Sequence, residues 1–448
     1  MVNRHGTSGA GAVGVARLSW AAEAAAPAPV GRIAPDAAVQ PDDPSRSRSR
    51  AAGATGRAAA GADHGYVPEV DALRALAMTG VILMHCGLLP FGWMGVWLFF
   101  VVSGFAVSTS LLGGAGQEPL GRRAILRFHA RRALRIWPVY IAFVLLGAVY
   151  LAEAGRWGAL VDMPWLLSFT FNLDMIFKTY TPRNAWSGFA HLWTLSVEQQ
   201  FYLVFPFLLL LRGRRARSMA LLAAIAAAPA IRAAAGAAAH HAGWDAERAA
   251  FAVYAFGPAH FDAFALGTLI ALYRRELTGN RRAAALAAAA ALLVTLTYGG
   301  IYAWLGVARA GGISVEALRN IVSGILYGDG RQVLVYYVPV SMAVAALTGI
   351  LAAGPAWLRL GRLPGLQAIG RVSYGGYLFH LPVLIVLLAL APGLGAHRSG
   401  ADDPGALGYV LRHGALFVIA YAVTLAVAAS SFVWFESPIA RLGRKRAR

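Results

Sequence analysis

Long apolar segments separated by short arginine-rich loops dominate this sequence of 448 residues and restrict what it can fold into. Segments of about 20 apolar residues are long enough to cross a bilayer as helices. Only 14% of the residues are charged, a smaller share than soluble domains carry. The sequence therefore predicts an all-α, polytopic membrane protein with ten transmembrane helices, roughly at 70–88, 93–112, 136–152, 192–211, 218–238, 258–273, 283–304, 332–353, 372–392 and 409–435.

The positions of the arginines predict how these helices are oriented. Every basic cluster follows an even-numbered span, whereas the other loops hold aromatic residues, Asp, Gly and Pro. Since basic loops stay in the cytoplasm, both termini are expected there. The formal net charge of +19 then reflects membrane topology, and no nucleic-acid partner is expected. The clusters lie at 122–135, 212–217, 274–282, 359–371 and 441–448.

Composition divides the chain into three regions. Residues 1–65 are rich in Ala, Gly, Pro, Ser and Arg without a sustained apolar period, so a disordered arm is expected. Residues 66–440 form the membrane domain, and residues 441–448 a basic cytoplasmic tail. The only cysteine, Cys86, excludes a disulfide within the chain. No sequence pattern has the spacing of metal ligands, so no metal is expected.

An arginine and a histidine, Arg74 and His85, lie eleven positions apart in the first expected span. Eleven helical steps of about 100° return to within roughly 20° of the start, so both side chains share one stripe, about 16 Å apart. Ionisable groups inside a membrane are costly and mark functional sites. A histidine can transfer protons near neutral pH, and an arginine can hold an anion. The pair indicates proton-transfer chemistry within a membrane.

A second ionisable group, Glu198, lies in the fourth span and shares a helix face with Tyr202, four residues later. A carboxylate that fixes the tautomer of a histidine raises its basicity, so Glu198 is a candidate partner of His85. The alternative is a structural glutamate bonded to an arginine.

The loop at 122–135 contains more arginines than orientation requires. Arg131, Arg132 and Arg135 lie at helical spacing just below the third span and could hold the phosphates of a cytosolic cofactor. The alternative is anchoring to anionic lipid. Ser103 beside Gly104 favours close helix packing over a direct role, and His380 is open to either a direct or a packing role.

Five motifs in this order resemble the acyltransferase-3 family of integral membrane O-acyltransferases. The resemblance covers nearly all of the chain after residue 65. The five motifs are Asp71-x-x-Arg74 with ten residues to His85, Phe99-Phe-Val-Val-Ser103-Gly104-Phe105, Arg132-x-x-Arg135-Ile-x-Pro138-x-Tyr140, His191-x-Trp193-x-Leu-x-x-Glu198-x-x-Phe-Tyr202, and Ser373-Tyr374-x-x-Tyr377-Leu-x-His380-x-Pro382.

The resemblance implies transfer of an acyl group, usually acetyl, from acyl-CoA to a hydroxyl of a glycan, a macrolide or a similar acceptor. It also implies ten core helices, an essential histidine, and arginines that engage the CoA end. The arm at 1–65 departs from the family pattern. The short stretch after residue 440 leaves no room for the esterase-like domain of some members, so a single-domain enzyme is expected.

O-acyl transfer is the leading hypothesis. His85 acts as general base with help from Glu198, in direct transfer or through an acyl-histidine. Acyl-CoA is a co-substrate held by Arg131, Arg132 and Arg135 with Arg74, and no cofactor is bound permanently. The expected location is the plasma membrane, with a glycan, macrolide or lipid-linked acceptor. The residues expected to support the site or to bind substrate are Asp71, Ser103, His191, Trp193, Tyr202, Tyr374, Tyr377 and His380.

Two other functions remain open from the residues alone. His85, Glu198 and His380 could form the proton relay of a transporter or lipid flippase. Alternatively, the polar residues could only pack the helices of a membrane-embedded scaffold.

Overall fold

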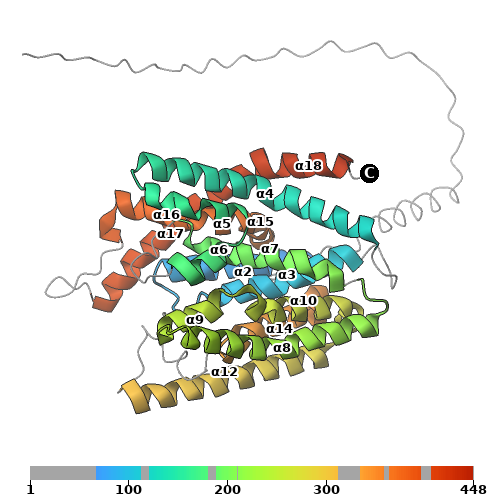
Figure 1. The fold of residues 1–448 in the computed structure, drawn as a ribbon. Coiled ribbons are helices and arrows are strands. Elements are labelled where there is room, and N and C mark those ends of the chain that lie inside the picture. The colour runs from blue at the N-terminus through green and yellow to red at the C-terminus, as the bar shows by residue number, and fades with distance from the viewer. Residues whose placement is uncertain are drawn as a thin grey trace, which may run out of the picture. The chain divides into compact units, whose positions relative to one another are not determined.

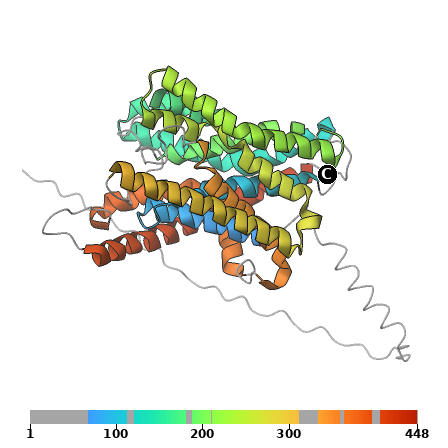
Figure 2. The same ribbon diagram turned by 90° about the horizontal axis from the view of Figure 1, so that it is seen from below.

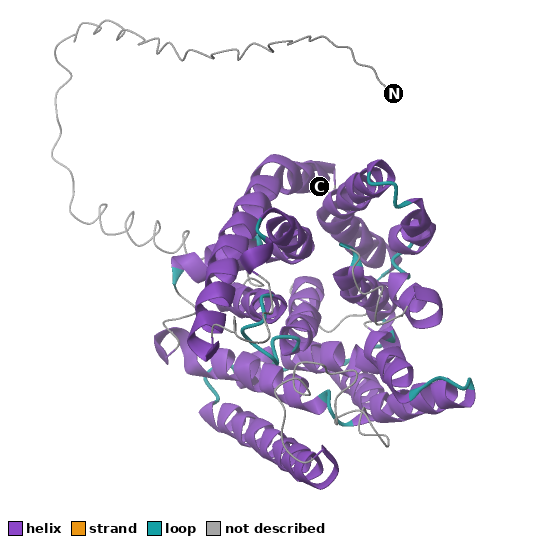
Figure 3. Ribbon diagram, turned by 90° about the vertical axis from the view of Figure 1, so that its left-hand side faces the viewer, coloured by secondary structure: helices purple, strands orange, loops and turns teal. Residues whose placement is uncertain are grey.

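The computed structural model describes residues 67–112, 121–179, 188–208, 210–310, 333–357, 363–394 and 405–446, all within the unit Asp63–Arg448. In these residues every regular element is a helix and no strand occurs, as Figure 3 shows, which confirms the all-α prediction. The arm expected at 1–65 lies outside the described residues.

A helix occupies each of the ten segments expected to span the membrane (Figure 1). These helices are α2 (Pro68–His85), α3 (Met94–Leu112), α4 (Arg122–Glu153), α7 (Trp193–Leu208), α8 (Arg214–His241), α10 (Phe261–Leu272), α12 (Arg281–Ala310), α14 (Tyr337–Trp357), α16 (Ser373–Leu390) and α17 (Gly405–Ser431).

Shorter helices connect or flank these ten. The α-helices among them are α5 (Met163–Leu167), α6 (Phe171–Asp174), α9 (Ala246–Ala255), α11 (Arg274–Leu277), α15 (Pro364–Arg371) and α18 (Ser437–Arg446). The 3-10 and π elements are η1 (Trp157–Asp162), η2 (Met175–Thr179), η3 (Ala190–Leu192), η4 (Gly257–His260), η7 (Pro392–Leu394) and η8 (Phe432–Glu436).

Six helices of the described chain are long and apolar enough to cross a membrane, namely α3, α4, α8, α12, α16 and α17. A seventh candidate is the pair formed by α9 and the segment Gly257–Leu272, which meet at a bend of 71°. The helix α7 has only 16 residues, and α2 carries Glu69, Asp71 and Arg74 near its start. The chain is therefore a multi-pass membrane protein, and its expected site residues lie both on three of these long apolar helices, α3, α4 and α16, and on α2 and α7.

The arginine-rich segment at 122–135 is helical and not the loop expected from the sequence. It forms the first half of α4, which continues as one helix of 32 residues through Pro138. Arg, Ala and Leu all favour helix, and the sequence of this segment consists largely of them. The prediction failed because a run of charge was taken as a connection between spans.

The helices α3 and α10 pack with their backbones very close together. A Cβ atom added to Gly104 would lie 2.1 Å from the Phe264 carbonyl oxygen, and one added to Gly267 would lie 1.9 Å from that of Val101. Only glycine permits this spacing, which supports the packing interpretation of the Ser103-Gly104 pair. In addition, α2 and α14 pack against α3 and α12 packs against α14. The helix α12 lies along the lower edge in Figure 1 and nearest the viewer in Figure 2.

An ion pair joins α8 to α10 within the same part of the bundle. The Arg232 guanidinium lies 2.5 Å from the Asp262 carboxylate, and both side chains are 0% exposed. The guanidinium also donates to the Ala259 carbonyl and lies 5.1 Å from the ring centroids of Tyr336 and Tyr337. The arginine inside the expected span at 218–238 is therefore neutralised within the protein.

Candidate active site

Three histidines from separate parts of the sequence converge at one place. His85 is the last residue of α2, His191 lies in η3 just before α7, and His380 lies in α16. The ring centroids of His85 and His380 are 5.2 Å apart, and those of His191 and His380 are 5.0 Å apart. His191 and His380 are buried, whereas His85 is exposed. The structure thus gives His85 two buried imidazole neighbours.

Both buried histidines are held by backbone carbonyl groups of α16. The Nε2 atom of His191 lies 3.0 Å from the Leu378 oxygen, and the Nδ1 atom of His380 lies 2.6 Å from the Tyr377 oxygen. The Tyr377 ring lies 5.3 Å from the His380 ring and 5.5 Å from the His191 ring. These contacts fix α16 against the start of α7 and set the orientation of both rings.

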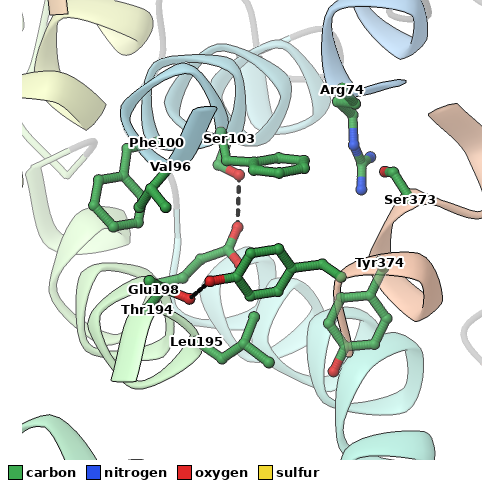
Figure 4. Close-up of a pocket in the computed structure, with 11 residues that line it drawn as sticks. Arg74, Val96, Phe100, Ser103, Thr194, Leu195, Glu198, Ser373 and Tyr374 are labelled. Carbon is green, nitrogen blue, oxygen red and sulfur yellow. Dashed lines mark hydrogen bonds between the residues drawn. The ribbon is translucent and has the colours of Figure 1, made fainter. Parts of the chain in front are cut away.

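A pocket lies beside this histidine cluster and is bordered by Tyr377 (Figure 4). Its walls are mainly apolar, with polar groups at separate points, as is usual for ligand sites. Figure 4 shows Arg74 and Ser373 on the same side of the pocket, and Ser103 facing Glu198 across it. The lining residues are Arg74, Val96, Phe99, Phe100, Ser103, Thr194, Leu195, Glu198, Ser373, Tyr374 and Tyr377.

The Glu198 carboxylate accepts hydrogen bonds from two hydroxyl groups. Ser103 of α3 donates from 2.5 Å, and Tyr202 donates from one turn further along α7. Two donors hold the carboxylate in one orientation on the pocket wall. The structure thus brings Ser103, Glu198 and Tyr202 together, and the partnership of Glu198 with His85 stays a prediction.

Hydroxyl groups also join the pocket helices to one another. Thr194 of α7 donates to the Tyr377 hydroxyl at 2.8 Å, which in turn lies 3.3 Å from the His191 carbonyl oxygen. Tyr374 donates to the Ile136 carbonyl of α4 at 3.2 Å. Tyr374 and Tyr377 therefore connect α16 to two different helices, and sequence spacing had not singled out Thr194.

Arginines from two helices gather near the start of α2. Arg135 is within electrostatic range of Arg74, Arg132 and Tyr202. The Arg132 guanidinium lies 5.1 Å from the Tyr202 ring centroid and 5.9 Å from that of Phe128, which places the charge over aromatic faces. We call Arg74, Arg132 and Arg135 the arginine cluster. Three like charges held this close favour an anionic ligand.

Two carboxylates accompany the arginine cluster. Asp71 of α2 is 7% exposed and is within electrostatic range of Arg135, as is Glu436 of η8, which accepts a hydrogen bond from Ser431 at 3.0 Å. The sequence signal of Glu436 is only that of an acidic residue at the end of an apolar span. Arg131 is exposed, and no contact among the described residues joins it to the cluster.

Trp193 does not line the pocket but packs the start of α7 against α9. It is 6% exposed and packs against Tyr254 of α9, with ring centroids 4.6 Å apart. Its place at the first residue of α7 fixes the start of the helix that carries Thr194 and Glu198. Within the described residues no group of three or more His, Cys, Asp or Glu side chains is arranged to hold a metal ion.

Comparisons with known proteins identify relatives of this chain. The O-acetyltransferase OatA of Staphylococcus aureus strain NCTC 8325 is 30% identical over 153 residues, which are 32% of this chain and 24% of OatA. A protein of strain COL, named an O-acetyltransferase only by inference, is 30% identical over 151 residues, 32% of this chain and 25% of its own length. The matched segment thus spans about a quarter of these relatives. No solved structure matches the chain.

The family comparison covers most of the membrane unit. The model of the acyltransferase domain that defines the acyltransferase-3 family matches residues 67–431. This match begins where the described structure begins and includes all of the residues that form the pocket, the histidine cluster and the arginine cluster. The chain belongs to the acyltransferase-3 family, whose acyltransferase domain it matches over most of its length.

Proposed function

We propose that the protein transfers an acyl group from acyl-CoA to a hydroxyl of a glycan, macrolide or lipid-linked acceptor, and that acetyl is the preferred acyl group. One observation carries the proposal, namely the placement of the arginine cluster and the histidine cluster around one pocket. Arg74 lines the pocket on one side and Tyr377 borders it beside the histidines. An anion site and a base near the same pocket suit a donor whose phosphates and thioester are far apart.

The arginine cluster would bind the phosphates of CoA. Guanidinium groups form paired hydrogen bonds with phosphate oxygens, and Arg132 is already oriented by the rings of Phe128 and Tyr202. Arg131 would add a contact at the exposed edge. Since CoA is supplied in the cytoplasm, this end would face inward, with ten spans and both termini cytoplasmic as the arginine distribution predicts. The plasma membrane is the proposed location.

His85 would act as the general base. The acceptor hydroxyl gives its proton to His85 while its oxygen attacks the thioester carbonyl. The carbon–sulfur bond then breaks, and the CoA thiolate takes the proton from His85 and leaves as the thiol. An acyl-histidine intermediate would use the same ring. Glu198, held by Ser103 and Tyr202, would help to orient the reacting groups from the pocket wall.

The test is transfer from radiolabelled acetyl-CoA in membranes that contain wild-type protein or His85→Ala at matched expression. We expect label in a glycan, lipid or small-molecule fraction only with the wild type, and the labelled fraction identifies the acceptor class. Equal labelling by the variant would contradict the role of His85. Flux driven by a pH gradient without acyl-CoA consumption would favour a transporter instead.

A further inference from the structure

The hydrogen on the His380 ring has its position set by the fold. The Nδ1 atom lies 2.6 Å from the Tyr377 carbonyl oxygen, and a carbonyl oxygen can only accept. Nδ1 therefore carries the hydrogen. A neutral imidazole has one ring hydrogen, so Nε2 has a free lone pair. A charged ring at this depth, beside two other imidazoles, would be strongly disfavoured. His380 is thus a buried acceptor through Nε2.

The same reasoning assigns the position of the ring hydrogen on His191. Its Nε2 atom lies 3.0 Å from the Leu378 carbonyl oxygen and therefore carries the hydrogen, which leaves the lone pair on Nδ1. The Nε2 atom of His380 and the Nδ1 atom of His191 are both buried without a hydrogen-bond partner in the described structure. The ring hydrogen of His191 is already donated to the Leu378 carbonyl, so His191 cannot donate a hydrogen bond to Nε2 of His380.

Backbone carbonyl groups accept the ring hydrogens of His191 and His380, whereas no carbonyl of the described residues accepts that of His85. Its ring centroid lies 5.2 Å from that of His380 with a tilt of 41° between the planes. No hydrogen bond joins the two rings as they stand, and a small rotation of the His85 ring would bring its N–H within hydrogen-bond distance of His380 Nε2. His85 is also exposed, so its other nitrogen can meet a ligand. An unpaired buried acceptor is costly, which favours this bond.

We propose that His380 is a positioning residue that accepts the ring hydrogen of His85 and so fixes which His85 nitrogen acts as the base. This inference rests on the proposed function. In this arrangement one His85 nitrogen is bonded to His380 Nε2, and the other keeps its lone pair toward the acceptor hydroxyl. During transfer the proton from that hydroxyl moves to His85 and then to the departing thiolate, so no further reactant is needed. The bond to His380 stabilises the charged His85 ring in between.

The geometry offers a matched pair of substitutions at position 380. Gln places its amide near the position of Nε2 and keeps an acceptor for His85. Asn places its amide near the position of Nδ1 and keeps only the bond to the Tyr377 carbonyl. A role in packing alone predicts that the two variants behave alike. A positioning role predicts that His380→Gln retains much more activity than His380→Asn.

We expect His380→Asn to lower kcat by about 10- to 100-fold, the size of effect produced by losing groups that orient metal-bound histidines. The KM for acetyl-CoA should stay within about twofold, because His380 does not line the donor pocket. His380→Gln should stay within roughly fivefold of wild-type kcat. Equal kcat in the two variants, whether both are reduced or both are unaffected, would overturn the proposal.

His260 provides the control for folding effects. It is also fully buried, donates through one nitrogen to a backbone carbonyl at 2.9 Å, and leaves its other nitrogen unpaired. Its ring contacts Trp97, Phe100 and Tyr336 and not His85. His260→Gln, which keeps the donor position, should leave kcat unchanged. A loss in this variant equal to that of His380→Asn would overturn the proposal.

A measurement that does not need turnover keeps the inference separate from the proposed function. Protein labelled with ¹⁵N-histidine should show one His85 tautomer in the wild type and exchange between two tautomers in His380→Asn. An unchanged His85 signal would overturn the positioning role. If wild-type protein shows no His85-dependent acyl transfer but the tautomer changes as expected, the proposed function fails and the contact between the two histidines stands.

Discussion

The ring of His85 at the end of α2 lies 5.2 Å from the ring of His380 in α16, although most of the membrane unit separates them in sequence. The same α2 carries Arg74 near its start, where the arginine cluster gathers. One helix therefore contributes to both ends of the site. The base and the anion-binding group have a separation set by helical geometry, about 16 Å along the axis, which does not depend on any loop.

Arg132→Ala should weaken acyl-CoA binding by roughly 10- to 100-fold, because a charge-assisted hydrogen bond contributes about 1.5–3 kcal/mol. Arg132→Lys should give an intermediate loss, since an ammonium group cannot form a paired hydrogen bond with phosphate. Arg131→Ala should have the smaller effect, because Arg131 is exposed and outside the cluster. Equilibrium binding of acetyl-CoA to purified protein in detergent is the measurement. Equal losses at 131 and 132 would contradict the assignment of the cluster.

Glu198→Gln should lower kcat by about 100-fold, because the amide no longer provides a charged acceptor for Ser103 and Tyr202. Ser103→Ala removes one of the two donors and should cost less, about tenfold. Initial rates with saturating acetyl-CoA compare the two variants. A larger loss from Ser103→Ala would show that the serine hydroxyl acts directly and that Glu198 only orients it.

Asp262→Asn should destabilise the protein by about 3–5 kcal/mol, because it leaves the buried Arg232 charge without its partner. The double variant Arg232→Met with Asp262→Leu removes both charges and should recover most of that loss. Thermal unfolding in detergent, followed by circular dichroism, gives the comparison. If the double variant melts no higher than Asp262→Asn, the pair has a role other than mutual neutralisation.

A pair of carboxylates in η1 and α6 should make stability depend on pH. Burial, together with the neighbouring Asp174 carboxylate, raises the pKa of Asp162 to about 6, and nearby Lys178 only partly offsets this. Because the folded state holds the proton more tightly than the unfolded state, this contribution to stability is present at low pH and is lost as pH rises from about 4 to about 6.

Asp162→Asn should remove this pH dependence and raise the melting temperature most at pH 7 and above. Melting temperatures of the wild type and the variant between pH 4.5 and 8, in the same detergent, provide the test. Parallel pH profiles for the two proteins would show that the folded state does not raise the pKa of Asp162.

Helix positions could be predicted from the sequence because each depends on a local run of apolar residues. The expected segments at 70–88 and 93–112, for example, correspond to α2 and α3 within a few residues. The shared stripe of Arg74 and His85 is likewise a property of one helix. The segment at 122–135 shows where such local prediction fails. Its many charges indicated a loop between two spans, whereas the chain is helical there and continues as helix through Pro138.

Sequence patterning by itself determined that this chain is an all-α membrane protein and which reactive residue types it carries, since hydropathy and helical spacing act over a few turns. Tertiary structure alone decided which of those residues meet. His380 reaches His85, Glu198 is held by Ser103, and Arg232 is neutralised by Asp262. The physical reason is that such contacts depend on how helices distant in sequence pack and rotate against one another, as glycines 104 and 267 do for α3 and α10.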